Sequence, residues 1–131
     1  MAAKLQVELV SPERRLWAGE AEMVIAKTPE GEVGVMARHA PVFGTLVDGS
    51  VVRLKGVEDG DLYAAVYGGF FSVAENRVSI LAEAAELGGE IDIEEAKTAL
   101  ERALASNDED EVAKIEAQRA KARLRAAGHE A

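Results

Sequence analysis

Glu30-Gly31-Glu32-Val33-Gly34-Val35-Met36-Ala37-Arg38-His39-Ala40-Pro41 is the stretch around which this chain is organised. Two glycines bracket a Glu-Val pair, and a proline closes the run. Because glycine tolerates positive φ and proline fixes φ, the stretch predicts a tight turn, a short strand and a second bend. The simplest interpretation is a hairpin corner that does no more than connect strands.

Short apolar and β-branched runs lie on both sides of this stretch. Leu5, Val7 and Leu9 alternate with polar residues, which predicts a strand with one buried face. Asp48-Gly49 predicts a hairpin turn, and Gly68-Gly69 predicts a bulge or a close approach of two backbones. Further strands are predicted at residues 15–19, 22–28, 42–47, 51–55, 62–67, 70–73 and 77–82. This spacing predicts a β-sandwich of about ten strands over residues 1–86.

The composition changes after Leu87-Gly88-Gly89, where the chain becomes rich in Ala, Glu, Lys and Arg. Apolar residues recur at helical spacing, and Asp92 is a suitable N-cap with Glu95 completing a capping box. Ser106-Asn107-Asp108 breaks this helix, and a second helix is predicted from Asp110 to Ala126. Residues 90–131 therefore predict a C-terminal α-helical hairpin. The apolar stripe of the second helix is thin: Ala113, Ala117, Ala120 and Leu124.

Composition excludes several kinds of partner. The net charge is −9, and a nucleic acid or an anionic lipid surface would need a basic face. There is no cysteine, no apolar signal segment at the N-terminus and no apolar run of membrane-spanning length. We therefore expect no nucleic acid and membrane association only through a partner. Since aromatics are only 5% of the chain, Trp17 and the three Phe residues are predicted to anchor the packing.

The two limbs of the hairpin differ in charge. Residues 83–111 carry eleven acids and two bases, whereas residues 112–131 carry five bases and two acids. One interpretation is complementarity to the helix dipoles. The other is that the basic second helix binds an acidic surface elsewhere.

The sequence lacks the residues of a catalytic or metal site. Two histidines cannot build a three-histidine metal site, and no phosphate-binding P-loop is present. His39 by itself is more often a turn or core histidine than a functional one. We expect a protein that is not an enzyme and has neither a metal nor a cofactor.

Three segments resemble the epsilon subunit of the F-type, proton-translocating ATP synthase. Residues 31–41 resemble the family pattern G-x-x-G-I-x-P-G-H-A-P, with Ala37 and Arg38 where Pro and Gly are usual. Residues 68–83 resemble G-G-F-x-x-V followed by N-x-V-x-V-L-A-E. Ile91-Asp92 resembles the opening of the family's helical hairpin. Together these segments extend the resemblance over nearly the whole chain.

The resemblance implies a non-catalytic rotor subunit in the central stalk. Such a subunit sits with the gamma subunit at the foot of the rotor and couples proton flow through the c-ring to ATP synthesis in the alpha/beta catalytic head. Its hairpin can extend along gamma and block ATP hydrolysis. The implied location is the cytoplasmic face of the bacterial plasma membrane, as a peripheral part of the complex.

The resemblance also implies roles for particular residues. We expect the turn residues to lie together at one end of the sandwich and to face the c-ring and gamma: Glu30, Gly31, Glu32, Arg38 and His39. We expect the basic residues of the second helix to contact the catalytic head: Arg119, Lys121, Arg123 and Arg125. Replacing its arginines with alanine should then raise ATP hydrolysis.

Some bacterial members of the family bind ATP through an I/L-D-x-x-R-A motif. Here Ile91 and Asp92 match, but Glu95 replaces the arginine, which leaves a degenerate site completed by Arg119 and Arg123. Because a carboxylate repels a polyphosphate, we expect no micromolar ATP binding. A free-standing nucleotide-sensing or ligand-binding β-sandwich is the alternative function, and a small β-barrel enzyme is a third.

Overall fold

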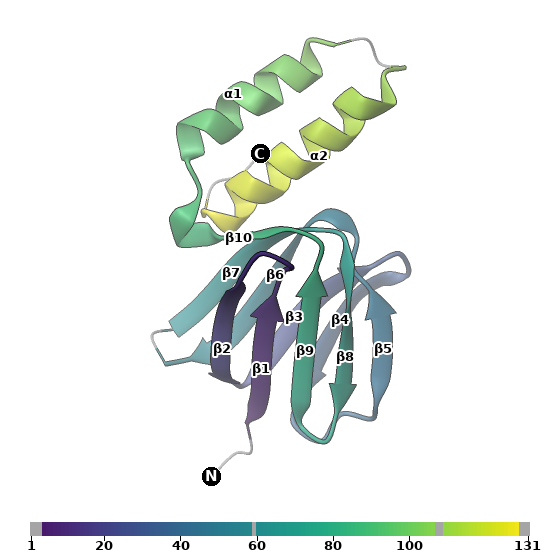
Figure 1. Cartoon of the computed structure of the whole chain (residues 1–131), viewed down its shortest axis with the longest axis vertical. Helices are drawn as coiled ribbons and strands as arrows, with labels where there is room; N and C mark the ends of the chain where they lie inside the picture. The colour runs from purple at the N-terminus through teal and green to yellow at the C-terminus, as the bar shows by residue number, and fades with distance from the viewer. Residues whose placement is uncertain (1–3, 59, 107–108, 129–131) are drawn as a thin grey trace.

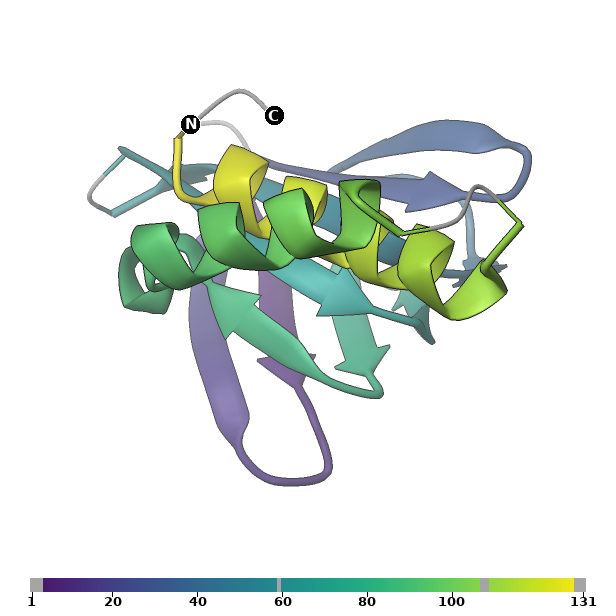
Figure 2. The same ribbon diagram turned by 90° about the horizontal axis from the view of Figure 1, so that it is seen from above.

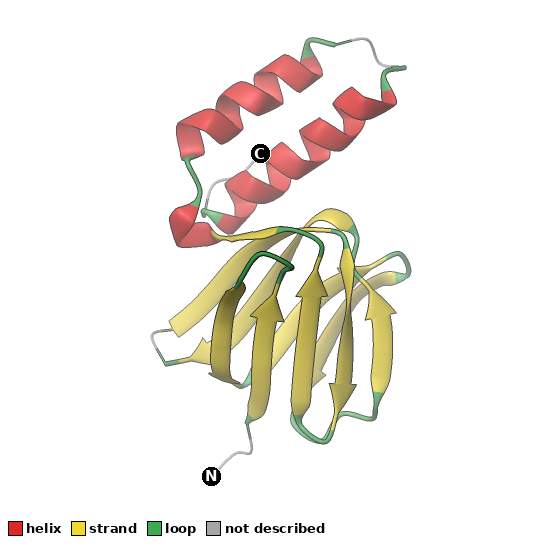
Figure 3. Cartoon of the chain, viewed as in Figure 1, coloured by secondary structure: helices red, strands yellow, loops and turns green. Residues whose placement is uncertain are grey.

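The computed structural model of the protein describes residues 4–58, 60–106 and 109–128. Two five-stranded sheets pack face to face, and two helices lie across one end of the assembly (Figure 1). Figure 3 separates the strands of the sandwich from the helical pair that follows them in the chain. The prediction of a ten-stranded β-sandwich followed by a helical hairpin is therefore confirmed.

The first sheet has the strand order β2-β1-β9-β8-β5. Its strands are β1 (Leu5–Val10), β2 (Arg15–Ala21), β5 (Val42–Thr45), β8 (Gly69–Ala74) and β9 (Arg77–Ala82). β1 runs parallel to β9, and the other neighbours are antiparallel. Leu5, Val7 and Leu9 are at most 3% exposed, as their alternation predicts.

The second sheet has the order β10-β7-β6-β3-β4. Its strands are β3 (Met23–Thr28), β4 (Gly31–Met36), β6 (Asp48–Val57), β7 (Gly60–Tyr67) and β10 (Ala85–Leu87). Gly68 and Gly69 carry the chain from β7 into β8 of the other sheet. A side chain at Gly69 would collide with the carbonyl of Leu81, so the predicted close backbone approach is confirmed.

The predicted hairpin turn at Asp48-Gly49 is wrong. β5 pairs with β8 in the first sheet, whereas β6 pairs with β3 and β7 in the second. The chain crosses between the sheets here, and Asp48 and Gly49 begin β6 with a register shift before Ser50. Gly49 has a φ of 77°, which both a hairpin turn and a strand irregularity accommodate.

The core between the sheets is aliphatic with one large ring. Phe71 is 1% exposed, and Trp17 is partly buried against the same core. Phe43 and Phe70 are 67% and 42% exposed, so the prediction that all three Phe residues anchor the packing is wrong for these two. They lie on the outer face of the first sheet instead.

A short 3₁₀ turn, η1 (Gly88–Glu90), leads into the hairpin helices α1 (Ile93–Leu104) and α2 (Glu111–Ala126). Asp92 caps α1 by accepting a hydrogen bond from the Glu95 backbone N–H at 3.1 Å. The Glu95 carboxylate does not complete the predicted capping box; it lies 3.5 Å from Arg123 Nη1. The predicted helix break at residues 106–108 lies partly outside the described residues.

The second helix lies between the first helix and the sandwich. α2 packs on β6 and β7, and α1 packs on α2, as the view from above shows (Figure 2). A second apolar cluster fills this interface: Ala65, Ile91, Ala96, Ala122, Leu124 and Ala126. Because four of these six are alanines, and one buried methylene is worth only ~0.8 kcal/mol, the fully buried part of this interface contributes modestly. Tyr63 and Tyr67 pack against the cluster and are only partly buried.

The predicted segment boundaries nearly match the observed elements. The boundary at residue 86 falls inside β10, whose last residue is Leu87. The outermost residues of both predicted segments, 1–3 and 129–131, lie outside the described residues. Whether residues 1–86 and 90–131 behave as separate domains stays a prediction.

Candidate functional site

The β3–β4 turn presents two of the predicted interface carboxylates. Thr28 holds this turn: its hydroxyl donates to the Gly31 carbonyl at 2.9 Å and accepts from the Glu30 N–H at 3.2 Å. Glu30 is exposed at the tip, and Glu32, with a side chain 61% exposed, lies 3.3 Å from Arg53 on β6. The two carboxylates are therefore fixed in backbone position and open to solvent.

Arg38 and His39 follow β4 at its other end. Strand β4 spans Gly31–Met36, so Glu30 and His39 lie beyond opposite ends of a strand ~16 Å long. The expectation that these turn residues share one end of the sandwich is wrong. The predicted interface residues therefore lie at both ends of β4, and one small partner surface cannot contact the two ends at once.

Arg38 occupies the left-handed region that usually requires glycine, with a φ of 72°. Its backbone N–H donates to Asn76 Oδ1 in the β8–β9 turn at 2.6 Å, and the His39 N–H donates to the Met36 carbonyl at 3.2 Å. These bonds hold the strained turn in place. The family pattern has glycine here, so this chain keeps the backbone shape with an unfavourable residue.

On α2, Arg119 forms a two-pronged ion pair with the start of β6. Its Nε donates to Asp48 Oδ1 at 2.9 Å and its Nη2 donates to Asp48 Oδ2 at 2.8 Å. Gln118 adds a bond from Nε2 to the Asp48 carbonyl at 2.8 Å. We call Asp48, Gln118 and Arg119 the clasp.

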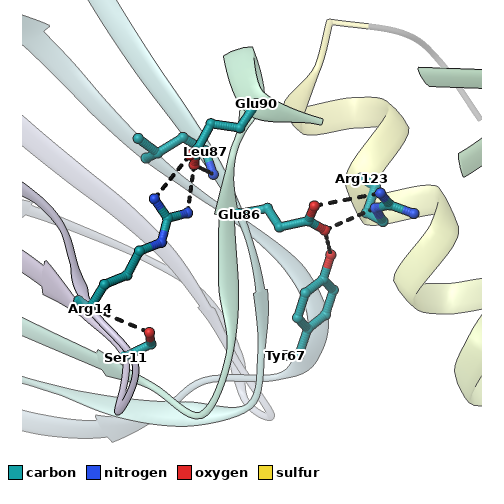
Figure 4. A network of polar contacts seen from close by, with 7 residues as sticks. All are labelled: Ser11, Arg14, Tyr67, Glu86, Leu87, Glu90 and Arg123. Carbon is teal, nitrogen blue, oxygen red and sulfur yellow. Dashed lines mark hydrogen bonds and ion pairs between the residues drawn. The ribbon is translucent and has the colours of Figure 1, made fainter. Parts of the chain in front are cut away.

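One turn further along α2, Arg123 meets a second acidic position of the sandwich (Figure 4). Its Nε lies 2.9 Å from Glu86 Oε1 without forming an aligned hydrogen bond, and its Nη2 donates to Glu86 Oε2 at 3.5 Å. Tyr67 donates its hydroxyl to the same Oε1 at 2.6 Å. Arg123 Nη1 also lies 3.5 Å from Glu95 on α1, so this guanidinium joins three elements.

The surroundings of Tyr67 favour the protonated form of its hydroxyl. Burial, followed by its hydrogen bond to Glu86, raises the pKa of Tyr67 well above its ordinary value of 10.0. The hydroxyl therefore stays protonated and remains a donor at neutral pH. Arg119 lies over the same ring, with its Cζ 5.5 Å from the ring centroid.

The other two basic residues of the predicted head-contact set are less engaged. Among the described residues, no ion pair joins Lys121 or Arg125 to a carboxylate. Arg125 borders a cavity of about 260 Å³ beside the second sheet, together with Lys27, Arg53 and Glu32. The structure thus divides the set into two docked arginines and two free cations.

The residues of the degenerate ATP site are only partly brought together. A cavity of about 410 Å³ between the helices and β7 is lined by three arginines and three glutamates: Arg102, Arg119, Arg123, Glu86, Glu95 and Glu116. Ile91 is 8% exposed in the apolar cluster beneath α2, and the Asp92 carboxylate caps α1. The expected arginines are therefore present, but with an equal number of carboxylates around them.

An exposed apolar surface that was not predicted from the sequence lies on the first sheet. Phe43 and Phe70 stack at 5.2 Å between ring centroids, and Leu81 beside them is 39% exposed. Val10 and Pro12 join Phe70 and Leu81 around a hollow of about 340 Å³. We call Phe43, Phe70, Leu81, Val10 and Pro12 the apolar patch. Strand alternation alone could have found it, because Phe70 and Phe71 necessarily point to opposite faces.

The linker to the hairpin is fixed by a two-pronged ion pair (Figure 4). Arg14, in the β1–β2 turn, donates to Glu90 at 2.7 and 2.9 Å, and Glu90 also accepts from the Leu87 N–H at 3.2 Å. The hydrogen bond from Arg14 lowers the pKa of Glu90 below its ordinary value of 4.5. No sequence pattern indicates this contact, because 76 residues separate the two partners.

The described residues bring no three metal-binding side chains together. Within the same residues, neither helix has the length and apolar character needed to cross a membrane.

Comparison with known proteins identifies the kind of β-sandwich domain and the family to which the whole chain belongs. A family model described as "ATP synthase, Delta/Epsilon chain, beta-sandwich domain" matches residues 4–88. The ATP synthase epsilon chain of Thermobifida fusca is 54% identical over 97% of this chain and 94% of its own length. That of Streptomyces griseus is 49% identical over 96% of this chain and 97% of its own length. The chain belongs to the family of ATP synthase epsilon chains.

Two solved structures resemble the chain in fold. A chain of the Euglena gracilis mitochondrial ATP synthase (OSCP/F1/c-ring) matches 98% of this chain and 84% of its own length, with a TM-score of 0.80 and 27% identity. A chain of the Tetrahymena thermophila enzyme (central stalk/c-ring) matches 95% of this chain and 93% of its own length, with a TM-score of 0.58. At 18% identity, the second match indicates the fold alone.

Proposed function

We propose that this chain is a non-catalytic subunit of the central stalk of a proton-translocating ATP synthase. In this role it couples rotation of the c-ring to ATP synthesis in the alpha/beta head, and its hairpin regulates ATP hydrolysis. The observation that carries the proposal is the 54% identity to an ATP synthase epsilon chain across sandwich and hairpin alike. The chain would reach the cytoplasmic face of the bacterial membrane only as part of that complex.

The apolar patch supports a contact with the gamma subunit. Contiguous exposed apolar surface on a soluble protein commonly marks a binding surface for another protein. The patch lies on the first sheet, and the backbone of Arg38 is hydrogen-bonded to the β8–β9 turn of that sheet. We therefore assign Phe43, Phe70, Arg38 and His39 to gamma.

The β3–β4 turn supports a contact with the c-ring. Glu30 and Glu32 lie in and next to the turn between β3 and β4 of the second sheet. The c-ring loops in this family are typically basic. Complementary charge fixes the register of such a contact more than it adds affinity. We therefore assign Glu30, Gly31 and Glu32 to the c-ring.

Co-purification tests the gamma assignment. The double substitution Phe43→Ser and Phe70→Ser should abolish co-purification with the ATP synthase complex while the isolated subunit keeps its melting temperature, because both rings are exposed. The matched control is Phe71→Ser, which should unfold the subunit because this ring is 1% exposed. Normal co-purification of the double variant would contradict the assignment.

We further propose that the subunit works without bound ATP. The cavity between the helices holds three glutamates beside its three arginines, which offsets the positive charge that a polyphosphate requires. Titration calorimetry on the isolated subunit should give no saturable isotherm at micromolar ATP. The variant Glu95→Arg, which rebuilds the family motif, should bind more tightly than the natural chain; a saturable micromolar isotherm for the natural chain would contradict the proposal.

A further inference from the structure

Two arginines expected to reach the catalytic head are already held by carboxylates of this chain. Arg119 pairs with Asp48 at 2.8 Å, and Arg123 lies 2.9 Å from Glu86. Both carboxylates belong to the sandwich, and both arginines belong to α2. The contacts that dock the hairpin and the contacts expected at the head therefore require the same side chains.

The clasp is a close-fitting contact rather than a loose surface pair. A Cβ at Gly49 would lie 2.9 Å from Gln118 Cγ and 3.1 Å from the Arg119 backbone nitrogen. The start of β6 thus approaches the helix backbone as nearly as a glycine permits. Asp48, next to this glycine, is carried into position to receive both Gln118 and Arg119.

We propose that Asp48 is an internal competitor for the catalytic head. In the docked hairpin, Asp48 forms an ion pair with Arg119. Arg119 becomes available to an acidic surface of the head only when the clasp opens. The strength of the clasp then sets how much of the subunit is in the inhibitory form. This inference rests on the regulatory part of the proposed function.

The competition gives the two partners of one ion pair opposite effects on hydrolysis. Asp48→Asn opens the clasp and leaves Arg119 free, so it should strengthen inhibition. Arg119→Ala also opens the clasp but removes the cation that the head would bind, so it should not strengthen inhibition. A purely structural ion pair would give both substitutions the same sign.

The first measurement follows docking in the isolated full-length chain. Because the chain has no cysteine, spin labels can be attached to cysteines introduced by Ala74→Cys on β8 and Thr98→Cys on α1. Both positions are exposed. Asp48→Asn should lower the ratio of docked to undocked hairpin by up to about fivefold, the upper end of the range for an exposed ion pair. Glu58→Gln removes a carboxylate near the far end of β6 and should leave the distance distribution unchanged.

A second variant places the perturbation on the helix. Gln118→Glu sets a carboxylate against the Asp48 carbonyl and should open the hairpin without altering the sandwich. If neither Asp48→Asn nor Gln118→Glu changes the distance distribution, the clasp does not control docking and the inference is overturned.

The second measurement is ATP hydrolysis by the complex assembled with each variant. Asp48→Asn should slow hydrolysis relative to the natural chain, whereas Arg119→Ala should not. If Asp48→Asn opens the hairpin but leaves hydrolysis unchanged, the regulatory part of the proposed function fails even though the clasp controls docking. If Asp48→Asn and Arg119→Ala slow hydrolysis equally, the competition for Arg119 is overturned.

Discussion

At the scale of the residue, Arg38 stands where the family pattern has glycine, and the turn keeps its backbone shape. A non-glycine residue in the left-handed region costs roughly 1–2 kcal/mol, and Arg38 bears this cost at a φ of 72°. The hydrogen bond from its backbone N–H to Asn76 Oδ1 compensates in part. The turn keeps its shape, but at the expense of stability.

Arg38→Gly should therefore stabilise the isolated subunit. Relief of the left-handed strain exceeds the extra backbone entropy of glycine in the unfolded chain by about 0.5–1 kcal/mol. Thermal unfolding should show a melting temperature a few degrees higher. Arg38→Ala is the matched control, because it removes the same side chain but keeps the strain, and it should give no such gain; an unchanged or lower melting temperature for Arg38→Gly would contradict the argument.

Charge reversal at Glu32 separates an interface role from a structural one. The pair with Arg53 is largely exposed, and such pairs contribute at most about 1 kcal/mol. Glu32→Lys should shift the melting temperature by only a few degrees but weaken ATP-driven proton pumping of the assembled complex. Glu58→Lys applies the same change of charge elsewhere on the sandwich and should pump normally. Equal pumping by the two variants would refute the c-ring assignment.

At the scale of the element, local sequence signals succeeded where local chemistry decides the structure. Alternation identified the buried face of β1, and a single aspartate identified the start of α1. The Asp48-Gly49 signal failed because the same dipeptide serves a hairpin turn and a strand irregularity. The pairings of β5 with β8 and of β6 with β3, both between strands distant in sequence, decided between them.

The same reasoning explains why the functional surfaces were only partly predictable. The basic character of α2 was visible in the sequence, but its division into docked and free cations depends on Asp48 and Glu86 from the sandwich. Likewise, Glu30 and His39 were predicted to lie together in turns at one end of the sandwich. A six-residue strand between them carries them apart.

The linker between sandwich and hairpin should respond to acid. Arg14 lowers the pKa of Glu90 below 4.5, so this contact contributes stability above pH 4.5 and loses it as the pH falls through the lowered value. Carboxylate chemical shifts measured by NMR should show Glu90 titrating below 4.5 in the natural chain. In Arg14→Gln the pKa of Glu90 should return toward 4.5; a pKa of Glu90 that is the same in both proteins would refute the contact.

At the scale of the whole molecule, the protein combines a large core with a weakly attached appendage. The main core lies entirely between the two sheets, whereas the hairpin is attached through an alanine-rich cluster and ion pairs. A weakly attached element can move at small cost, which suits a regulatory part. The sequence predicted both parts, but it did not predict that α2 lies against the second sheet.

A chain ending at residue 88 should fold without the hairpin. All core residues between the sheets lie within residues 5–87, and this length keeps β10 whole. Circular dichroism should show a β-rich, cooperatively melting protein with a lower melting temperature, because Tyr63, Ala65 and Tyr67 lose their cover. A spectrum typical of an unfolded chain would show that the hairpin is part of one indivisible domain.

ATP hydrolysis by the assembled complex tests whether the sandwich couples and the hairpin regulates. The complex should be prepared with the full chain and with residues 1–88, and both ATP hydrolysis and ATP-driven proton pumping should be measured. We expect faster hydrolysis with residues 1–88 while pumping remains coupled, because the sandwich keeps its contacts and only the regulatory hairpin is lost. Equal hydrolysis rates with the two chains, or a failure of residues 1–88 to join the complex, would contradict this expectation.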